Sequence, residues 1–182
     1  NDAFGTAHRE HASNASITSH FATKGMGILI EKEVKFLSEN LSNPIKPLTL
    51  IIGGAKIDTK IAVIENFLGL ADNIIIGGAM ANTFMASMGR EVGLSLMEKE
   101  KVDTASMLIN KANRKKTKIV LPIDFTGELK EFGSGDICSA DANNIPSDMI
   151  CEDIGEKSIN LFTNIISDSE TVLWNGTVGV AE

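Results

Sequence analysis

The stretch LTLIIGGAKIDTK, residues 48–60, decides the fold and raises the question of a binding site. An unbroken apolar run stops at Gly53 and Gly54, and Lys56 and Lys60 follow four positions apart. Such a run, bounded by turn residues, is typical of a strand buried on both faces in a parallel sheet. Cations near a helix start are poorly placed for helix stability but suit a bound polyanion. Spacing alone supports this reading and a solvated glycine turn about equally.

The same pattern of apolar runs and helical periodicity recurs along the chain. Three more apolar runs occur at residues 73–76, 118–121 and 171–174. Patterns of helical spacing separate the runs, at residues 57–67, 102–112 and 158–165. This alternation predicts an α/β fold, a three-layer parallel sheet built from Rossmann-like βαβ units. The polar residues 124–148 interrupt it and predict a long excursion with short strands at most.

A second glycine pair, Gly77 and Gly78, follows the second apolar run in the spelling IIIGGAM. In an open parallel sheet, ligands bind at the carboxyl ends of the strands, where both glycine pairs would lie. Glycine permits close backbone approach, and the following helix would direct its N–H groups at an anion. Neither pair belongs to a P-loop or to a G-x-G-x-x-G dinucleotide motif.

The N-terminal part of the chain shows a different sequence pattern. Residues 1–22 contain no amphipathic element, whereas residues 27–43 predict a helix that ends at the Asn43-Pro44 pair. The apolar stripe of this helix consists of Ile30, Val34, Leu37 and Leu41. Because the chain starts without methionine and stops directly after a strand pattern, we interpret it as an internal segment of a longer protein.

Composition narrows the function classes. The chain has 182 residues, a net charge of -7 and 43% hydrophobic residues, which suits a globular protein and argues against nucleic acid as a partner. No apolar run approaches the roughly 18 residues of a membrane span. Two cysteines, Cys138 and Cys151, are too few for a disulfide scaffold. We therefore expect a reduced, cytoplasmic setting.

Four blocks of the chain form a specific pattern when taken together. They are NDAFGTAHREHAS (1–13), IIGGAKIDTKI (51–61), IIIGGAMANTF (74–84) and TVLWNGTVGVAE (171–182). The shorter stretches LPIDF and DIGEKS lie between them. In this order the blocks resemble the phosphoglycerate kinase family, and the resemblance covers essentially the whole chain.

The resemblance implies a domain organisation and a reaction. Residues 1–22 would be the tail of an N-terminal substrate-binding domain, residues 23–43 an interdomain linker helix, and residues 44–182 an incomplete C-terminal nucleotide-binding domain. The reaction would be reversible phosphoryl transfer between 1,3-bisphosphoglycerate and ADP, giving 3-phosphoglycerate and ATP in glycolysis. Mg²⁺ would come with the nucleotide, its protein ligand lying outside these residues. A cytoplasmic monomer is implied, and the 182 residues alone are expected to be inactive.

The resemblance also assigns roles to individual residues. Lys56 resembles the lysine that meets the transferring phosphoryl group, and Arg9 resembles one of the basic residues that grip 3-phosphoglycerate. The remaining matches are to nucleotide-binding residues: Gly53, Gly54, Lys60, Gly77, Gly78, Leu96, Cys151, Asn175, Gly176 and Glu182. Glu182 matches the carboxylate that binds the ribose hydroxyls. A metal site from His8, His11 and His20 is not expected.

Some positions depart from the family pattern, and other functions stay open. Glu152 stands where an apolar residue usually lines the adenine pocket, Thr177 replaces a usual proline, and Cys151 replaces a frequent glycine. Burying the Glu152 carboxylate would cost free energy unless it turns to water. One alternative is a catalytically inactive nucleotide-binding or binding protein on the same scaffold. Another is an unrelated Rossmann-type oxidoreductase, which the missing dinucleotide motif disfavours.

Overall fold

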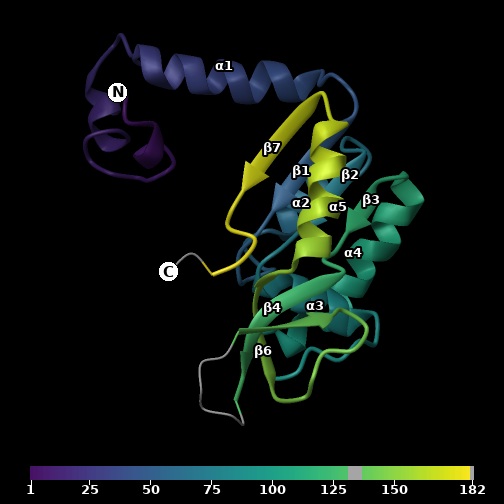
Figure 1. Ribbon diagram of the computed structural model, residues 1–182. Coiled ribbons are helices and arrows are strands. Elements are labelled where there is room, and N and C mark those ends of the chain that lie inside the picture. Colours follow the sequence, from purple (N-terminus) through teal and green to yellow (C-terminus); the bar gives the residue numbers. More distant parts are fainter. Residues whose placement is uncertain (131–136, 181–182) are drawn as a thin grey trace. The chain divides into compact units, whose positions relative to one another are not determined.

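The computed structural model describes residues 1–130 and 137–180, apart from the side chains of residues 39 and 40 (Figure 1). Glu182 therefore lies outside the described residues. The chain divides into two compact units, Asn1–Ile45 and Lys46–Glu182. The proposed roles of residues 1–22, 23–43 and 44–182 stay predictions.

The first unit consists of two short 3₁₀ helices, Phe4–Thr6 and Ser16–His20, followed by helix α1, Ile28–Ser42. The Asp2 carboxylate accepts a hydrogen bond of 2.9 Å from the N–H of Ile30 and so satisfies a donor in the first turn of α1. The predicted helix is thus present. Its apolar stripe is only partly covered, because Ile30 is buried whereas Val34 and Leu37 are exposed.

The second unit is organised around a parallel sheet. Its strands are β1 (Leu48–Ile52), β2 (Asn73–Ile76), β3 (Lys118–Val120) and β7 (Thr171–Asn175), in the order β3-β2-β1-β7. All neighbours pair in parallel, so the four strands expected from the apolar runs are confirmed. The helices are α2 (Ile61–Phe67), α3 (Ala79–Ser87), α4 (Val102–Lys115) and α5 (Glu156–Ser167). No described helix is long and apolar enough to cross a bilayer.

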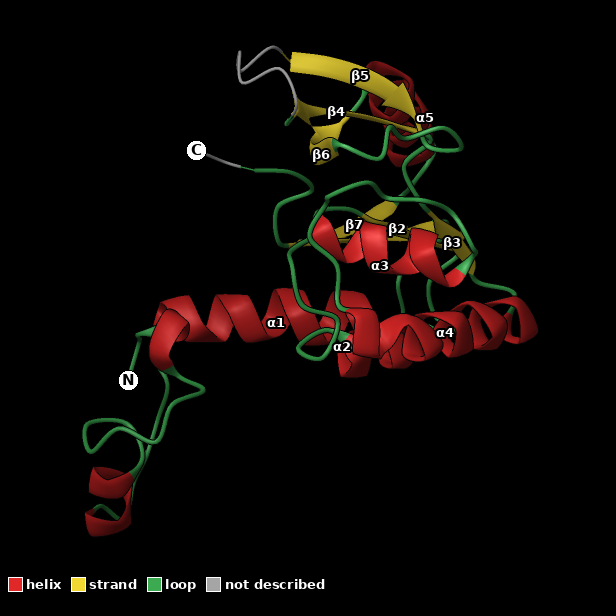
Figure 2. Cartoon of the chain, turned by 90° about the horizontal axis from the view of Figure 1, so that it is seen from below, coloured by secondary structure: helices red, strands yellow, loops and turns green. Residues whose placement is uncertain are grey.

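Both faces of the parallel sheet are covered, which explains why the strands read as unbroken apolar runs. Ile51, Ile75 and Val120 form a buried cluster with Phe162 of α5. The alternate residues of β1 and β2 are fully buried on the other face. They are Leu50, Ile52, Ile74 and Ile76. Helices α2 and α4 lie on that side and α5 on the opposite side (Figure 2). The predicted three-layer α/β architecture is therefore confirmed.

Residues 124–148 leave the parallel sheet, and their described part contains two short strands, which belong to a second sheet. Strands β4 (Asp124–Leu129), β5 (Ile137–Asp141) and β6 (Met149–Ile154) form an antiparallel sheet in the order β5-β4-β6. It packs on a buried cluster that includes Phe125 and Met149, with Met85 contributed by α3. β5 has only exposed and half-buried residues and β6 is buried only at Met149, so these strands lack the continuous apolar run of the parallel strands.

Asp124, the first residue of β4, joins the antiparallel sheet to helix α5. Its buried carboxylate accepts hydrogen bonds from the N–H groups of Lys157 and Ser158, at 2.9 and 2.7 Å, and from the Ser158 hydroxyl at 2.5 Å. Burial works to raise the pKa of Asp124, but these hydrogen bonds outweigh it and hold the pKa below its ordinary value. The carboxylate therefore caps the N-terminus of α5, whose preceding residue, Gly155, has no side chain to do so.

Candidate functional site

The strand order places a ligand site at the carboxyl end of β1. β1 lies between β2 and β7, so the order of the sheet reverses there, and open α/β sheets bind ligands at such a reversal. The N–H of Gly53 donates to the carbonyl of Asn175 over 2.9 Å, which joins the loops that follow β1 and β7. Two blocks far apart in the sequence thus meet at one edge.

The glycine pairs are needed because three loops contact one another through their backbones. A Cβ on Gly53 would lie 1.8 Å from the carbonyl oxygen of Thr177. Gly78 has a φ of +66°, and a Cβ there would lie 2.7 Å from the backbone N and O of Gly54. The N–H of Gly78 also donates to the carbonyl of Val178 over 2.7 Å. A side chain at either glycine would separate these loops.

These loops form the floor of a cavity of about 300 Å³. Four predicted nucleotide-binding residues line it: Gly54, Gly78, Leu96 and Cys151. The other lining residues are Ala55, Ala79, Ile150, Glu152, Thr177, Gly179 and Val180. The structure therefore brings together residues from five separate segments. Sequence reasoning did not select the short segment after Gly176, although its block was part of the resemblance.

Both lysines lie in the loop that follows β1 rather than on one helical face, because α2 begins only at Ile61. The ammonium group of Lys60 donates a hydrogen bond to the Asn175 side-chain oxygen, so two predicted nucleotide residues contact each other. Lys56 follows the cavity-lining Ala55 and is exposed. Within the described part of the chain, its ammonium group has neither a hydrogen bond nor an ion pair.

Glu98 holds this loop in place, a role that sequence reasoning missed. Its carboxylate accepts a hydrogen bond of 2.5 Å from the N–H of Ile57, and its own N–H donates to the Thr83 hydroxyl over 3.0 Å. These contacts fix the residue after Lys56 to helix α3. No local sequence pattern indicates these contacts, because Ile57 and Glu98 are distant in the sequence.

The start of α3 carries an unpaired acceptor near the cavity. Asn82 is 2% exposed, and its amide nitrogen donates to the carbonyl of Leu96 over 3.1 Å. Its side-chain oxygen has no partner among the described residues. Asn82, Gly78 and Glu152 line a void of about 10 Å³, which is the size of one water molecule. We expect a water there, since an unpaired buried acceptor is costly.

The other predicted residues take separate positions. Gly77 follows β2, and its N–H donates to the carbonyl of Ile52 over 2.9 Å, while Gly176 follows β7 and its carbonyl accepts from the Trp174 indole over 2.7 Å. Arg9 is exposed in the first unit. Burial raises the pKa of the Cys151 thiol despite its contact with Ser95, so the thiol stays protonated.

The described residues contain no group of three or more His, Cys, Asp or Glu side chains that could hold a metal ion.

Comparisons with known proteins agree in pointing to a single family. The sequence model of the phosphoglycerate kinase family matches residues 1–182. A phosphoglycerate kinase of Enterococcus faecalis is 50% identical over 183 residues, covering 100% of this chain and 45% of the relative. One of Fusobacterium nucleatum is 48% identical over 185 residues, covering 100% of this chain and 46% of the relative. The chain thus spans less than half the length of these relatives.

Solved structures extend the agreement to the backbone. The phosphoglycerate kinase of Coxiella burnetii superimposes with a TM-score of 0.88 at 36% identity, over 98% of this chain and 46% of that chain. The enzyme of Pyrococcus horikoshii gives a TM-score of 0.83 at 26% identity, over 99% of this chain and 46% of that chain. Sequence match, strand order and loop geometry therefore converge, and the chain belongs to the phosphoglycerate kinase family.

Proposed function

We propose that the protein carrying this chain transfers a phosphoryl group reversibly between 1,3-bisphosphoglycerate and ADP, giving 3-phosphoglycerate and ATP. One observation carries the proposal. A cavity lined by Gly54, Gly78, Leu96 and Cys151 lies at the carboxyl ends of the strands. Lys56, which has no hydrogen bond or ion pair in the described part of the chain, directly follows the lining residue Ala55. A cavity for a nucleotide beside a free cation suits phosphoryl transfer.

The proposed nucleotide position follows from the shape and charge of the cavity. Backbone at Gly54 and Gly78 and the apolar Leu96 would contact the base. The phosphates would meet the contact pair Lys60 and Asn175. No side chain caps the N-terminus of helix α3 at Gly78, and the N–H of Met80 donates instead to the carbonyl of Gly54 over 3.0 Å. The proposed ribose contact of Glu182 stays a prediction.

The chemical role falls to Lys56. The transferring group carries its charge on three equatorial oxygens, so the protein acts by positioning and electrostatic stabilisation, with no covalent intermediate on the enzyme. An exposed ammonium group without a protein partner is free to meet that charge. Lys60, held by Asn175, stays with the nucleotide. The loop contact of Glu98 with Ile57 would keep Lys56 in position.

The remaining partners are proposed from the family. Arg9 would grip 3-phosphoglycerate, since its planar guanidinium can pair with two oxygens of a phosphate or carboxylate. Mg²⁺ would arrive with the nucleotide substrate, and its protein ligand would lie outside residues 1–182. We propose a cytoplasmic monomer without nucleic-acid or membrane partners.

A coupled assay with ATP and 3-phosphoglycerate tests the proposal on the protein that carries this chain. We expect turnover that depends on both substrates, and none from the 182 residues expressed alone, which span 45% of the relatives' length. Nucleotide binding measured by calorimetry separates the alternatives. Binding without turnover would establish an inactive nucleotide-binding protein, and preferential binding of a nicotinamide dinucleotide would establish the oxidoreductase alternative.

A further inference from the structure

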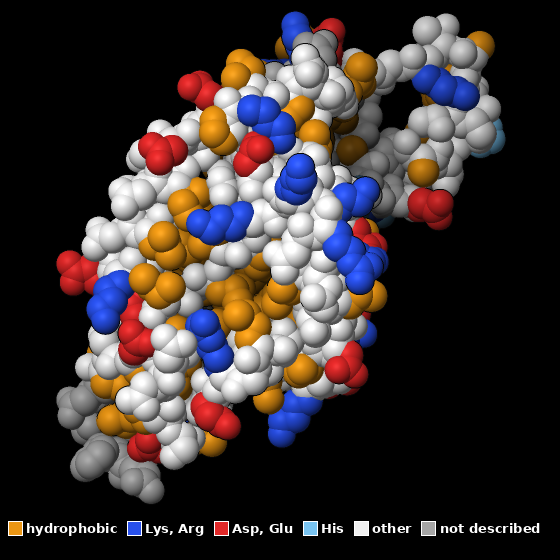
Figure 3. Space-filling model, turned by 90° about the vertical axis from the view of Figure 1, so that its right-hand side faces the viewer, with side chains coloured by type: hydrophobic (Ala, Val, Ile, Leu, Met, Phe, Trp, Pro, Cys, Tyr) orange, Lys and Arg blue, Asp and Glu red, His pale blue; other side chains and the backbone are white. Residues whose placement is uncertain are grey.

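A second hollow lies away from the nucleotide cavity, at the free edge of the parallel sheet. It measures about 250 Å³ and lies between β3, helix α4 and the turn after α3. It shares no lining residue with the nucleotide cavity. Figure 3 shows hydrophobic side chains gathered in a hollow on this face, with Lys and Arg side chains spaced around it. This hollow is therefore separate from the nucleotide cavity.

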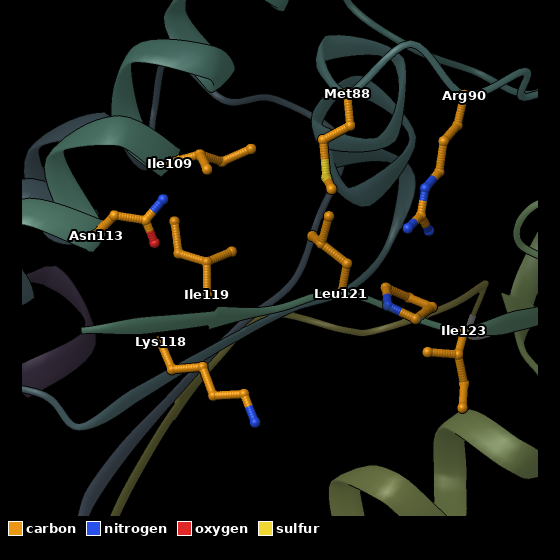
Figure 4. A pocket seen from close by; sticks show the side chains of 9 residues that line it. Met88, Arg90, Ile109, Asn113, Lys118, Ile119, Leu121 and Ile123 are labelled. Carbon is orange, nitrogen blue, oxygen red and sulfur yellow. The ribbon is translucent and has the colours of Figure 1, made fainter. Parts of the chain in front are cut away.

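The hollow has an apolar floor and walls. Ile119 and Leu121 rise from the β3 segment on the same side as Ile109 of α4, and Met88 extends toward Leu121 (Figure 4). Because β3 is the end strand, no further strand covers this edge in the described part of the chain. Lys118 also lines the hollow, but its side chain extends from the opposite side of the strand to that of Ile119 (Figure 4).

Arg90 supplies the one guanidinium group of this hollow, and that group lacks an anionic partner. The side chain is half-buried, and its guanidinium extends toward Leu121 (Figure 4). Its contact is the sulfur of Met85 at 3.6 Å, a weak acceptor. No described carboxylate lies within ion-pair distance of Arg90. A guanidinium has five donors in a planar fork that matches a carboxylate, so most of its donors are free for a ligand.

The volume limits the size of what can bind. A cavity of about 150 Å³ holds benzene, so the larger hollow admits an aromatic ring with a short chain. The hollow is open to the surface, so the polar end of such a molecule can reach Arg90. Asn113 of α4 lies on the wall across from it and offers an amide (Figure 4). An apolar pocket with a few placed polar groups is the usual form of a small-molecule site.

We propose that this hollow is a binding site for a small carboxylic acid with an apolar body, whose carboxylate pairs with Arg90 and whose ring or chain contacts Ile109, Ile119 and Leu121. The site is independent of the proposed phosphoryl transfer, since it uses none of those residues.

The experiment uses 3-phenylpropanoate and the protein that carries this chain, labelled at its isoleucine methyl groups and saturated with ADP. We expect saturable shifts of the Ile109 and Ile119 methyl resonances with a Kd of about 1 mM, a typical affinity for so small a ligand. Ile150, which lines the nucleotide cavity, serves as the internal reference and should not respond. The neutral amide of the same probe should bind about tenfold more weakly, because it loses the charge-assisted pair.

Two variants of equal charge complete the test. Arg90→Gln should weaken 3-phenylpropanoate binding about tenfold, whereas Arg114→Gln, an exposed cation of α4 outside the hollow, should leave it unchanged. The proposal is overturned if the Ile109 and Ile119 methyl groups do not respond at about 10 mM probe. Equal affinity for acid and amide, measured on the unaltered protein, would overturn it as well, whatever the fate of the variants.

Discussion

Two glycine pairs with almost the same spelling, LIIGGAK and IIIGGAM, begin two different structures. After Gly54 the chain forms a loop, and helix α2 starts only at Ile61. After Gly78 helix α3 starts at once, at Ala79. One pair therefore opens a loop that can carry lysines beside the cavity, and the other directs a helix N-terminus at it. Similar motifs at neighbouring strands thus supply complementary parts of one site.

The difference follows from the residue three positions after the first glycine of each pair. It is Met80 in the second copy, which is fully buried, and Lys56 in the first, which is exposed. A methionine can enter the core as part of a helix that packs beneath the sheet. An ammonium group cannot do so without a large desolvation cost, so the chain stays outside the core until Ile57. Ile57 is fully buried, and Glu98 accepts its N–H.

The largest expected effect concerns the lysine that distinguishes the first loop. Lys56→Ala should lower kcat by about 10²–10³-fold, or about 3–4 kcal/mol, because the ammonium group would stabilise charge on the phosphoryl group only in the transition state. Nucleotide KM should change little. Steady-state kinetics of the protein that carries this chain, with ATP and 3-phosphoglycerate, measures both constants.

Lys60→Ala is the matched control, because it removes the same charge from the same loop. Its side chain contacts Asn175, so its loss should mainly raise the nucleotide KM. If kcat of the Lys56→Ala protein stays within about threefold of the parent, a loss below about 1 kcal/mol, Lys56 is a solvated loop residue and the proposed division of roles is wrong.

The glycines of the two pairs should also differ when substituted. Gly78→Ala should lower the free energy of unfolding by about 3 kcal/mol, because a Cβ at a φ of +66° would also meet the Gly54 backbone at 2.7 Å. Gly54→Ala has a φ of +117° but open space around the added carbon, so only strain of about 1–2 kcal/mol is expected. Urea unfolding compares the two, and equal losses would show that the loop contact contributes nothing.

The parallel sheet could be predicted from the sequence because its signal is local. Each strand is buried on both faces, so Leu48–Ile52 and Asn73–Ile76 appear as continuous apolar runs with turn residues after them. The antiparallel sheet gave no such signal, since β5 alternates exposed and half-buried residues such as Ser139 and Ala140. Its strands are defined by pairing partners, which a linear pattern does not contain.

The residues of the candidate site also fall into two groups, those that the sequence indicates and those that only the fold reveals. Gly54, Gly78, Leu96 and Cys151 could be selected by resemblance, and the structure places all four at one cavity. Glu98 could not be selected, because its significance depends on a contact with a loop formed much earlier in the chain. Positioning contacts of this kind depend on the tertiary structure, so they become visible only when the fold is known.

Asp124 offers a contrast to the open N-terminus of α3, because it fills the equivalent place at α5. Asp124→Asn should lower the free energy of unfolding by about 2 kcal/mol near pH 7, through loss of charge-assisted hydrogen bonds to Lys157 and Ser158. Because folding lowers the pKa of Asp124, this stability is present above its ordinary pKa of 3.8 and is lost as the pH falls through the folded-state pKa. The difference between parent and variant should therefore shrink in acid.

Chemical denaturation at about pH 7 and about pH 3 measures this change. Asp103→Asn, in the first turn of α4, is a suitable control, since this carboxylate is exposed. A constant difference between the Asp124→Asn protein and its parent across both pH values would mean that the charge on Asp124 does not stabilise α5.

Glu98→Gln should have a smaller effect, confined to the first glycine loop. The amide keeps an acceptor for the N–H of Ile57 but loses the charge, so the hydrogen bond weakens by about 1 kcal/mol. We expect kcat to fall about fivefold through looser placement of Lys56, with nucleotide KM nearly unchanged. Glu100→Gln, an exposed neighbour, is the control. A change in nucleotide KM alone would place Glu98 at the nucleotide rather than at the loop.

The smallest expected effect concerns the cavity that both glycine loops share. Glu152 lines this cavity with an exposed carboxylate, whereas Leu96, another lining residue, is apolar. A negative charge there repels nucleotide phosphates weakly through water and adds no apolar contact to the base. Glu152→Leu should therefore tighten ADP binding about threefold, with little change in kcat.

Calorimetry at low and high salt tests the cause of this effect. If charge repulsion contributes, the gain of the Glu152→Leu protein should shrink as salt screens it, leaving the part due to apolar contact. Glu156→Leu, an exposed carboxylate at the start of α5 that does not line the cavity, should leave ADP affinity unchanged and so control for net charge. Weaker ADP binding by the Glu152→Leu protein would reverse the interpretation, because it would mean that the carboxylate accepts a hydrogen bond from the nucleotide. Glu152 would then be an adaptation of this chain to its ligand rather than a departure that the loops tolerate.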